Sequence, residues 1–376
     1  MSKIKLGDLC VPKKGQIKGE VDVIIDYIDI ASVDNESKKV TGFQTMSFGE
    51  APSRARKAVE KGDILISTVR PNLNAVAILE DDTPNISVAS TGFCILKCKD
   101  NVDNRFVFNF CKSKAFIKDM VSQATGASYP AVNDDIVRSA LIPNYSYEEQ
   151  CHISEILDRV SFTIEKRKVE LRALDELIKA RFVEMFGDPQ INPFGWDVVN
   201  ISEVVGGKVS NGFFAKRDDY ADDGNVSVLG VSNIVNRMYS NVDKLPKTDA
   251  DDKDIEKFEV RYGDMLFCRS SLVAEGIGKA SIVPENVQDN VLFECHVIRL
   301  PLDLSKCVPE FMQALSTMDF FRNQVVAQSK TAIMTTIGQD GILKTDIILP
   351  PIDKQRTFYD FVHQVDKSKV AVLKIF

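Results

Sequence analysis

The chain has 376 residues, and this length indicates two domains rather than one. Its composition, 44% hydrophobic and 27% charged, is typical of a soluble globular protein. No run of about 18 apolar residues is present that would form a membrane helix, and the first residues lack the apolar core of a signal peptide, so we expect a cytoplasmic protein with no membrane partner. The formal net charge of −7 excludes nucleic-acid binding through overall basicity, although a local basic patch is sufficient for a binding surface.

The eight cysteines and three histidines do not form a metal-binding pattern. No Cys-x-x-Cys pair occurs, and Cys94 and Cys98 lie in a run with the composition of a strand. Cys295 and His296 lie far along the chain from Cys94 and Cys98, and the four residues lack the paired spacing of zinc ligands. We therefore expect no bound metal and reduced thiols that pack as small apolar residues.

The first part of the chain predicts a small domain of short strands followed by a helix. Strands are expected at 64–67, 75–79 and 93–96. The dipeptide Gly62-Asp63 before the first strand is typical of a turn. One helix is expected over residues 104–121, because apolar residues recur there at helical spacing. The mixture indicates an α/β domain with irregular loops.

A long helix is predicted next, from Glu148 to Phe186, about 58 Å long at about 1.5 Å per residue. Spacings of four and three residues alternate along it, and eight of the ten positions in this heptad seam are apolar. The seam consists of Ile153, Leu157, Val160, Ile164, Arg167, Leu171, Leu174, Ile178, Arg181 and Met185. The helix is expected to stop at Gly187, which precedes Asp188 and Pro189.

After this helix the chain repeats its first part. The segment Tyr-Gly-Asp-Met-Leu-Phe at 262–267 corresponds to Lys-Gly-Asp-Ile-Leu-Ile at 61–66, with a shift of 201 residues. Other pairs recur in the same order: 28–33 with 229–234, 6–9 with 201–204, 139–143 with 346–350, and Gln150 with Gln355. The second copy predicts strands at 265–268, 280–283 and 296–300 and a helix at 309–326. Two copies of one unit explain the whole set.

A second heptad seam closes the chain. Its positions lie 205 residues after those of the long helix and are Phe358, Val362, Val365, Lys369, Val372 and Phe376. The matching register favours two helices that pack on each other, whereas the alternative is a surface helix that packs on its own domain. This distal helix is apparently short, since the chain stops opposite Leu171.

Enzyme signatures are missing from the sequence. The segment Gly276-Ile277-Gly278-Lys279-Ala280 lacks the spacing and the hydroxyl of a phosphate-binding loop. No Asp/Asn-Pro-Pro-Tyr motif of an amino-methyltransferase occurs, and Gly206-Gly207 lacks the third glycine of a dinucleotide site. The acidic residues at 249–254 alternate with lysines and indicate a solvated loop. We expect a chain without catalytic activity.

The ordered set of motifs resembles the specificity subunits of Type I restriction–modification systems over essentially the whole chain. The motifs are the duplicated Leu-Gly-Asp-type opening, the two Gly-Asp strands, 125–130 (Thr-Gly-Ala-Ser-Tyr-Pro), Leu-Ile-Pro before Glu-Glu-Gln at 141–150, 347–351 (Ile-Ile-Leu-Pro-Pro) before Gln355, and Met-Phe-Gly-Asp-Pro at 185–189 before Gly195-Trp196.

The resemblance implies duplicated α/β (α+β-like) target-recognition domains, joined by long helices that form an antiparallel coiled coil. The corresponding segments are 1–145 (first domain), 146–187 (central spacer helix), 188–350 (second domain) and 351–376 (distal spacer helix). The implied partners are double-stranded DNA with a bipartite target, two methyltransferase (modification) subunits and a restriction (motor-nuclease) subunit. The resemblance also implies that this chain is non-catalytic and carries no cofactor, and that the methyltransferase subunit binds S-adenosylmethionine.

Arg, Lys, Asn and Gln in loops between the predicted strands are the candidate DNA-binding residues, because these side chains pair with base edges and phosphates. In the first domain they are Lys13, Lys14, Gln16, Arg54, Arg56, Arg70, Asn72, Asn74, Ser128 and Tyr129. In the second domain they are Asn211, Phe213, Lys216, Arg217, Asn233, Arg269, Ser270, Lys330 and Thr331. An alternative that fits the acidic net charge is a coiled-coil protein–protein adaptor that does not bind DNA.

Overall fold

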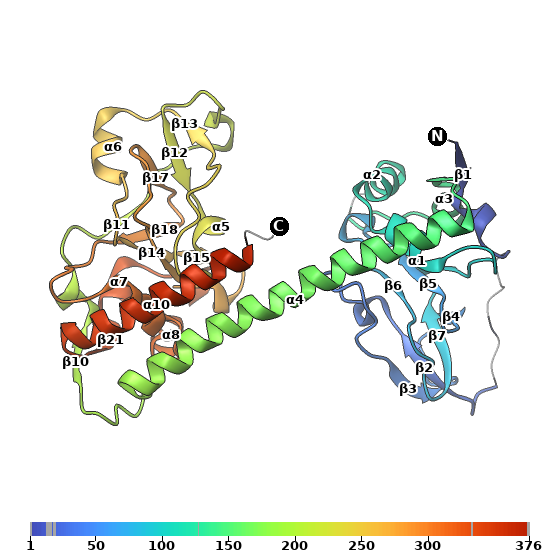
Figure 1. The fold of residues 1–376 in the computed structure, drawn as a ribbon, viewed down its shortest axis with the longest axis horizontal. Coiled ribbons are helices and arrows are strands. Elements are labelled where there is room, and N and C mark those ends of the chain that lie inside the picture. Colours follow the sequence, from blue (N-terminus) through green and yellow to red (C-terminus); the bar gives the residue numbers. More distant parts are fainter. Residues whose placement is uncertain (1, 13–16, 18–19, 127, 332–333, 374–376) are drawn as a thin grey trace. The chain divides into compact units, whose positions relative to one another are not determined.

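The computed structural model describes residues 2–12, 17, 20–126, 128–331 and 334–373, without the side chains of Arg217 and Leu373. It divides into two compact units, unit 1 (Met1–Glu165) and unit 2 (Lys166–Phe376) (Figure 1). The division falls inside one long helix, α4 (Tyr147–Phe186), which contributes residues to both units. The finer four-segment division stays a prediction.

The described part of unit 1 contains three small sheets and three short α-helices. A four-stranded sheet has the order β3-β2-β7-β4, a three-stranded sheet the order β6-β5-β8, and β1 pairs with β9. The strands are β1 (Lys3–Lys5), β2 (Ile24–Ile28), β3 (Gln44–Ser47), β4 (Ala55–Ala58), β5 (Ile64–Ser67), β6 (Val76–Ile78), β7 (Ile86–Ser90), β8 (Phe93–Leu96) and β9 (Leu141–Pro143). The helices are α1 (Asn104–Cys111), α2 (Lys114–Gln123) and α3 (Asp134–Ser139).

Unit 2 repeats this arrangement and adds elements. Its sheets have the orders β11-β18-β14-β16, β13-β12-β17, β15-β20-β19 and β10-β21. The strands are β10 (Asp197–Asn200), β11 (Ser210–Asn211), β12 (Val226–Leu229), β13 (Lys247–Thr248), β14 (Met265–Cys268), β15 (Ser270–Ser271), β16 (Ala280–Ile282), β17 (Val291–Phe293), β18 (Val297–Leu300), β19 (Lys330–Thr331), β20 (Thr335–Thr336) and β21 (Asp346–Leu349). The helices are α5 (Val231–Ile234), α6 (Asp252–Phe258), α7 (Pro309–Ser316), α8 (Asp319–Ala327), α9 (Gln339–Leu343) and α10 (Ile352–Leu373).

The repeated Gly-Asp dipeptide forms the same turn in both units. Gly62 and Gly263 have φ of 88° and 84°, a conformation that costs a glycine little. The next residue closes each turn, since a carboxylate oxygen of Asp63 accepts from the Glu60 amide at 3.0 Å, and Asp264 accepts from the Arg261 amide at 2.9 Å. A fully buried strand follows each turn, β5 in unit 1 and β14 in unit 2.

The repeated glutamine is a second shared device, which we call the glutamine clamp. Gln150 and Gln355 are buried at the start of α4 and α10. The Gln150 Oε1 accepts from the backbone N–H of Asp103, and the Gln355 Oε1 accepts from that of Val308, at 3.1 and 2.9 Å. These partners are the N-cap residues of α1 and α7. The clamp therefore joins each long helix to a short helix, and both of its ends repeat at a shift of 205 residues.

Each predicted helix at 104–121 and 309–326 was wrong as a single helix, because the structure forms two helices at each place. In unit 1 the break falls at Lys112 and Ser113, where the Ser113 hydroxyl caps α2 by accepting from the Phe116 amide at 3.2 Å. In unit 2 the break falls at Thr317 and Met318. The apolar periodicity continues across the break, because the helices on either side of it both pack on the core.

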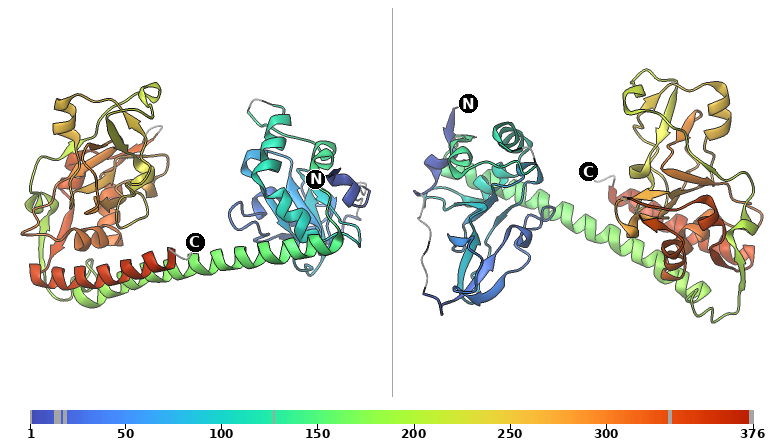
Figure 2. Two further views of the ribbon diagram at one scale, coloured as in Figure 1. Left: turned by 45° about the horizontal axis from the view of Figure 1, so that its top comes forward. Right: turned by 180° about the vertical axis from the view of Figure 1, so that it is seen from behind.

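Within unit 2, α10 lies beside the C-terminal part of α4 (Figures 1 and 2). Phe358 contacts Phe182 and Phe186 with ring centroids 5.6 Å apart in each pair. Farther along α10, the Lys369 ammonium lies 2.6 Å from the Asp175 carboxylate. Higher numbers on α10 therefore meet lower numbers on α4, which makes the two helices antiparallel.

The buried seam of α4 departs from the heptad pattern. Ile178 is followed by Phe182 and Phe186, all buried at four-residue spacing, whereas the pattern assigned Arg181 and Met185, which are only partly buried. A straight α-helix drifts relative to a repeat of 3.5 residues, and this drift brings the phenylalanines onto the buried face. The other seam residues of α4 are half-buried or exposed: half-buried Ile153, Leu171 and Leu174, and exposed Leu157, Val160 and Ile164.

On α10, Phe358, Val362 and Val365 are buried and Val372 is half-buried, while Phe376 lies outside the described residues. Among the described residues, no helix combines the length and apolarity needed to cross a bilayer.

Candidate nucleic-acid interface

Two of the predicted DNA-binding residues of unit 1 meet in space. Arg70 follows β5 in the left-handed conformation (φ 49°), and its backbone N–H donates to the Pro130 carbonyl at 2.7 Å. Its guanidinium lies over the ring of Tyr129, 4.9 Å from the centroid. Because 69% of Tyr129 is exposed, the pair presents a cation and a flat ring to solvent.

The segment that carries Tyr129 is a short hairpin, closed by paired backbone bonds of 2.9 and 3.0 Å between Thr125 and Ala131. Gly126 has a φ of 100°, and a Cβ there would lie 2.8 Å from the carbonyl oxygen of Tyr129, so the turn requires glycine. Ser128 is exposed on the same hairpin. The hairpin is held to the loop after β5 by the bridge between Val69 and Ala131.

Unit 2 forms the corresponding hairpin from β19 and β20. Ser270 of β15 pairs with Thr336, which also pairs with Lys330 of β19. This arrangement repeats the Val69–Ala131 and Thr125–Ala131 bridges of unit 1. Lys330 and Thr331 are exposed, and Ser270 is half-buried. We call the paired segments 125–126 with 128–131, and 330–331 with 334–336, the tip hairpins. The structure thus brings three predicted residues of unit 2 together.

Other predicted residues remain exposed without forming part of a tip hairpin. Arg54 lies 3.9 Å from Asp29, Asn72 is exposed in the 3-10 helix Pro71–Leu73, and Lys216 is exposed in a loop. Arg56 is half-buried instead: its guanidinium lies over the ring of Phe48, 5.0 Å from the centroid, and donates to the Ala55 carbonyl at 2.6 Å.

Several predicted residues are engaged in the fold. Asn74 is 6% exposed and donates to the Cys111 carbonyl at 3.0 Å. The Asn233 side chain accepts from the Gly230 amide and donates to the Asn241 carbonyl, both at 3.1 Å. Phe213 packs edge-on against Phe258, Arg269 donates to the Cys295 carbonyl at 3.1 Å, and Asn211 is half-buried in β11. Their side chains are explained by the fold itself.

Lys13, Lys14 and Gln16 lie outside the described residues, as does the side chain of Arg217.

Sequence reasoning missed a charged cavity of about 550 Å³ in unit 2. Its walls include Arg237, Lys279 and Arg322, and the Nη1 of Arg322 is buried without a hydrogen-bond partner among the described groups. Burial lowers the pKa of the Arg322 guanidinium. Lys369 on the same wall is neutralised by Asp175 at 2.6 Å. These cations come from distant sequence positions, so no local motif indicates them.

The cysteines give no sign of a metal centre in the part of the chain that the structure describes. All eight are free thiols, and no group of three or more His, Cys, Asp or Glu side chains is arranged to hold a metal ion among the described residues. Burial raises the pKa of the Cys94 and Cys307 thiols to about 12. Such thiols are inert and apolar in character.

One known family model matches the first part of the chain. Residues 1–173 match the family model of the Type I restriction modification DNA specificity domain. The first 173 residues therefore resemble a Type I restriction modification DNA specificity domain. The match covers unit 1 and the first part of α4, and the shared turn, clamp and tip hairpin show that unit 2 repeats the same architecture.

Two relatives of the chain are specificity subunits of Type I restriction enzymes. The HindI specificity subunit of Haemophilus influenzae is 25% identical over 142 residues, which cover 37% of this chain and 31% of the relative. The MjaIX specificity subunit of Methanocaldococcus jannaschii is 25% identical over 191 residues, which cover 46% of this chain and 43% of the relative. The chain therefore matches less than half of the length of either relative.

Two solved structures resemble the whole fold. The Type I restriction–modification S subunit from M. genitalium has a TM-score of 0.53 at 11% identity, with 99% of this chain and 91% of that chain covered. A chain from a structure on complex assembly and conformational transition of the Type I system has a TM-score of 0.50 at 20% identity, with 100% and 92% covered. At these identities the likeness concerns the fold: two β-rich units and packed long helices.

Proposed function

We propose that this chain is the DNA-recognition subunit of a Type I restriction–modification complex, in which each unit recognises one half of a bipartite target. The observation that carries the proposal is the duplicated tip hairpin, beside which each unit exposes polar side chains and one cation, Arg70 in the loop after β5 and Lys330 in β19. Loops on a rigid scaffold are common sites of recognition, because their sequence can change without altering the core.

The tip hairpins supply chemistry that suits DNA. A guanidinium such as that of Arg70 donates to guanine edges or to phosphates, and hydroxyl groups such as those of Ser128 and Thr331 bond to either. The exposed Tyr129 ring holds the Arg70 side chain in place, which lowers the entropy that binding must remove. The other exposed candidates, among them Arg54, Asn72 and Lys216, serve as contacts to the phosphate backbone in this scheme.

The long helix α4 and the antiparallel α10 act in this scheme as the spacer that fixes the gap between the two half-sites. α4 is one uninterrupted helix of 40 residues, a rigid element whose length translates into base-pair separation. The proposed segments remain 1–145 and 188–350 for recognition and 146–187 and 351–376 for the spacer.

The partners follow from this role. Two methyltransferase subunits with bound S-adenosylmethionine modify the target, and a motor-nuclease subunit joins them for cleavage. The chain itself recognises DNA without catalysing a reaction and binds no cofactor.

Sequence-resolved adenine methylation in cells tests the proposal. The gene is expressed with its neighbouring methyltransferase subunit, with and without this chain. We expect methylation at one split motif that disappears when the chain is removed. Unchanged methylation, with the methyltransferase shown to be expressed and folded, would refute the proposal and favour the coiled-coil adaptor.

A further inference from the structure

We propose that unit 2 contains a binding site for an arginine side chain, in which tyrosine rings and the buried Glu310 carboxylate enclose the guanidinium. The site does not depend on DNA recognition and involves none of the residues assigned to the tip hairpins.

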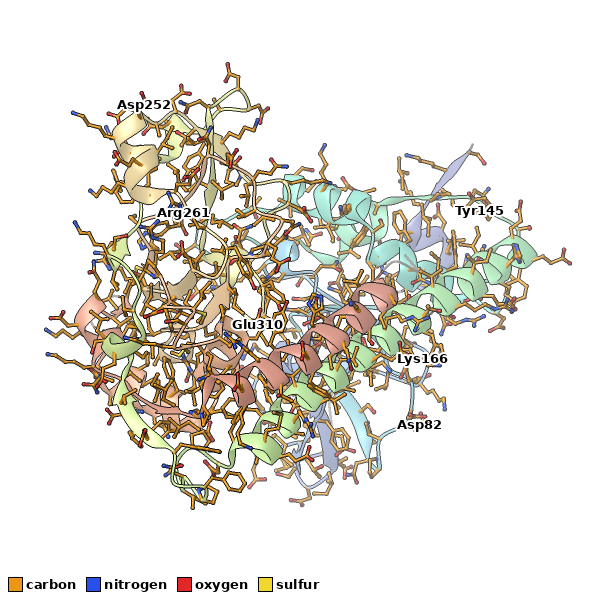
Figure 3. The ribbon with its side chains drawn as sticks, turned by 60° about the vertical axis from the view of Figure 1, so that its left-hand side comes forward. Asp82, Tyr145, Lys166, Asp252, Arg261 and Glu310 are labelled. Carbon is orange, nitrogen blue, oxygen red and sulfur yellow. The ribbon has the colours of Figure 1, made fainter. Side chains whose placement is uncertain are left out.

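The site is a cavity of about 210 Å³ where α7 meets α10 (Figure 3 labels Glu310). It is lined by three tyrosine rings and three carboxylates, from Tyr239, Tyr262, Tyr359, Glu285, Glu310 and Asp366. Among the described residues, no lysine or arginine lines it. A cavity with several acidic groups and aromatic walls, and with His363 but no described lysine or arginine in its lining, is complementary to an organic cation.

Glu310 points to a missing partner. Its side chain is 1% exposed, and its Oε1 accepts from the Tyr239 hydroxyl at 3.0 Å. Its Oε2 is buried without a hydrogen-bond partner among the described groups. An unpaired buried carboxylate oxygen is unfavourable, and a cationic donor that enters the cavity satisfies it. Burial also raises the pKa of Glu310, as expected of a carboxyl group that lacks such a donor.

The aromatic walls suit a flat cation. The His363 ring stacks on the Tyr359 ring with centroids 5.6 Å apart and planes 17° apart, which fixes one wall on α10. A guanidinium stacks on aromatic faces and donates from its edges, whereas an ammonium is a compact and strongly hydrated charge. Carboxylates at several sides of the cavity match the five donors of a guanidinium.

Unit 1 identifies the cation, because it carries an arginine at the equivalent place. The glutamine clamp fixes the correspondence at 205 residues, so Arg105 of α1 corresponds to Glu310 of α7, and Asp158 of α4 corresponds to His363 of α10. In unit 1 the Arg105 guanidinium bridges Asp103 and Asp158 at 3.1 and 3.2 Å. Unit 2 has replaced this internal arginine by a carboxylate, which leaves its corner dependent on an arginine from another molecule.

Calorimetry and ligand-observed NMR on the full chain test the site with three probes. These are the peptide acetyl-Gly-Arg-Gly-amide, the same peptide with citrulline as the neutral isostere, and n-butylguanidinium. We expect the arginine peptide to bind at least roughly tenfold more tightly than the citrulline peptide, because charge-assisted bonds are about twice as strong as neutral ones.

Variants locate the binding. Glu310→Gln should weaken the arginine peptide by roughly tenfold, and the matched control Glu256→Gln, exposed on α6, should leave its affinity unchanged. The double variant Glu310→Arg with His363→Asp rebuilds the pair of unit 1 and should abolish binding, because the cavity then holds its own guanidinium.

Equal affinity for the arginine and citrulline peptides would overturn the proposal, as would full affinity in Glu310→Gln. If Glu310→Gln does not fold, the variant with Glu285→Gln and Asp366→Asn removes two less buried carboxylates and should weaken binding several-fold; unchanged affinity there also overturns the site. Binding of n-butylguanidinium combined with failure of the arginine peptide to bind would overturn the arginine side chain as the source and assign a free alkylguanidinium.

Discussion

In both units a buried glutamine ties the start of a long helix to the cap of a short one, and in both a Gly-Asp turn precedes the central buried strand. The residue that follows the cap by two positions differs: Arg105 neutralises two aspartates in unit 1, whereas Glu310 is left with an unpaired oxygen in unit 2. The tips differ as well, since among the described tip residues a guanidinium stacks on an exposed ring in unit 1 but not in unit 2. The two units thus share one backbone frame but carry different charged side chains at equivalent positions.

The largest difference between the units lies along α4, because its C-terminal part packs against α10. We expect Phe182→Ala to destabilise unit 2 by about 3–5 kcal/mol, the usual cost of truncating a buried phenylalanine. Leu157→Ala, at a position that is 40% exposed in unit 1, should cost less than about 1 kcal/mol. Urea unfolding of each variant measures both values, and equal costs would contradict the packing seen here.

The glutamine clamp should be equivalent in the two units. Gln150→Leu and Gln355→Leu each leave a buried backbone N–H without its acceptor, and each should lower the free energy of unfolding by about 1–3 kcal/mol. Denaturant melts compare the two variants, with the exposed Gln190→Leu as the control. A cost confined to one of the two variants would show that the clamp is not a shared structural device.

The two equivalent corners, at Arg105 in unit 1 and at Glu310 in unit 2, should change the stability of their units with pH in opposite directions. The raised pKa of Glu310 means that the folded chain binds its proton more tightly than the unfolded chain, so its contribution to stability falls as pH rises from the ordinary glutamate pKa through the folded value. Glu310→Gln removes this dependence. Relative to the natural chain it should be more stable at neutral pH and equally stable below about pH 4, where the carboxyl is protonated in both states.

Asp103 shows the reverse case. Burial alone would raise its pKa, but hydrogen bonds from Arg105 lower it, so its stabilising contribution is present at neutral pH and is lost as pH falls through the folded value. Arg105→Met should therefore destabilise unit 1 at neutral pH and have little effect in acid. Thermal melts of both variants between about pH 2 and about pH 8, a range that spans the ordinary Asp and Glu pKa values, measure the two slopes, and slopes of the same sign would refute this assignment of the corner.

The sequence predicted the duplicated frame because its devices are short motifs that fold locally, such as Gly62-Asp63 and Gln150 with their repeats. It did not predict the sheet built from β2, β3, β4 and β7. Asp26 interrupts the apolar pattern of β2, yet it is buried because the Thr45 hydroxyl and the Asn85 amide donate to it at 2.7 and 2.8 Å.

The candidate site was predictable by residue type but not by geometry. Arg70 and Tyr129 were both expected to bind DNA, but 59 positions separate them, and only the pairing of the tip hairpin with the loop after β5 brings their side chains together. For Asn74 and Asn233 the residue type suited base recognition, while the fold already uses their amides. Residue chemistry cannot distinguish the two situations, because both depend on contacts between distant segments.

The smallest expected effect concerns the difference between the two tips. Arg70→Ala should weaken binding of the assembled complex to its DNA by roughly tenfold, because it removes one charged contact and the stacking that orders it. Arg269→Ala should have a smaller effect, since Arg269 already donates to the Cys295 carbonyl and its side chain is half-buried. Fluorescence anisotropy with DNA altered in one half-site at a time separates the two tips. Suppose that Arg70→Ala, but not Arg269→Ala, no longer distinguishes DNA with an altered half-site from the natural DNA, and at one half-site alone. The exposed guanidinium that stacks on Tyr129 would then contribute to recognition of that half-site. Unchanged affinity in both variants would remove both arginines from the interface and leave the hydroxyl-rich hairpins as the remaining candidates.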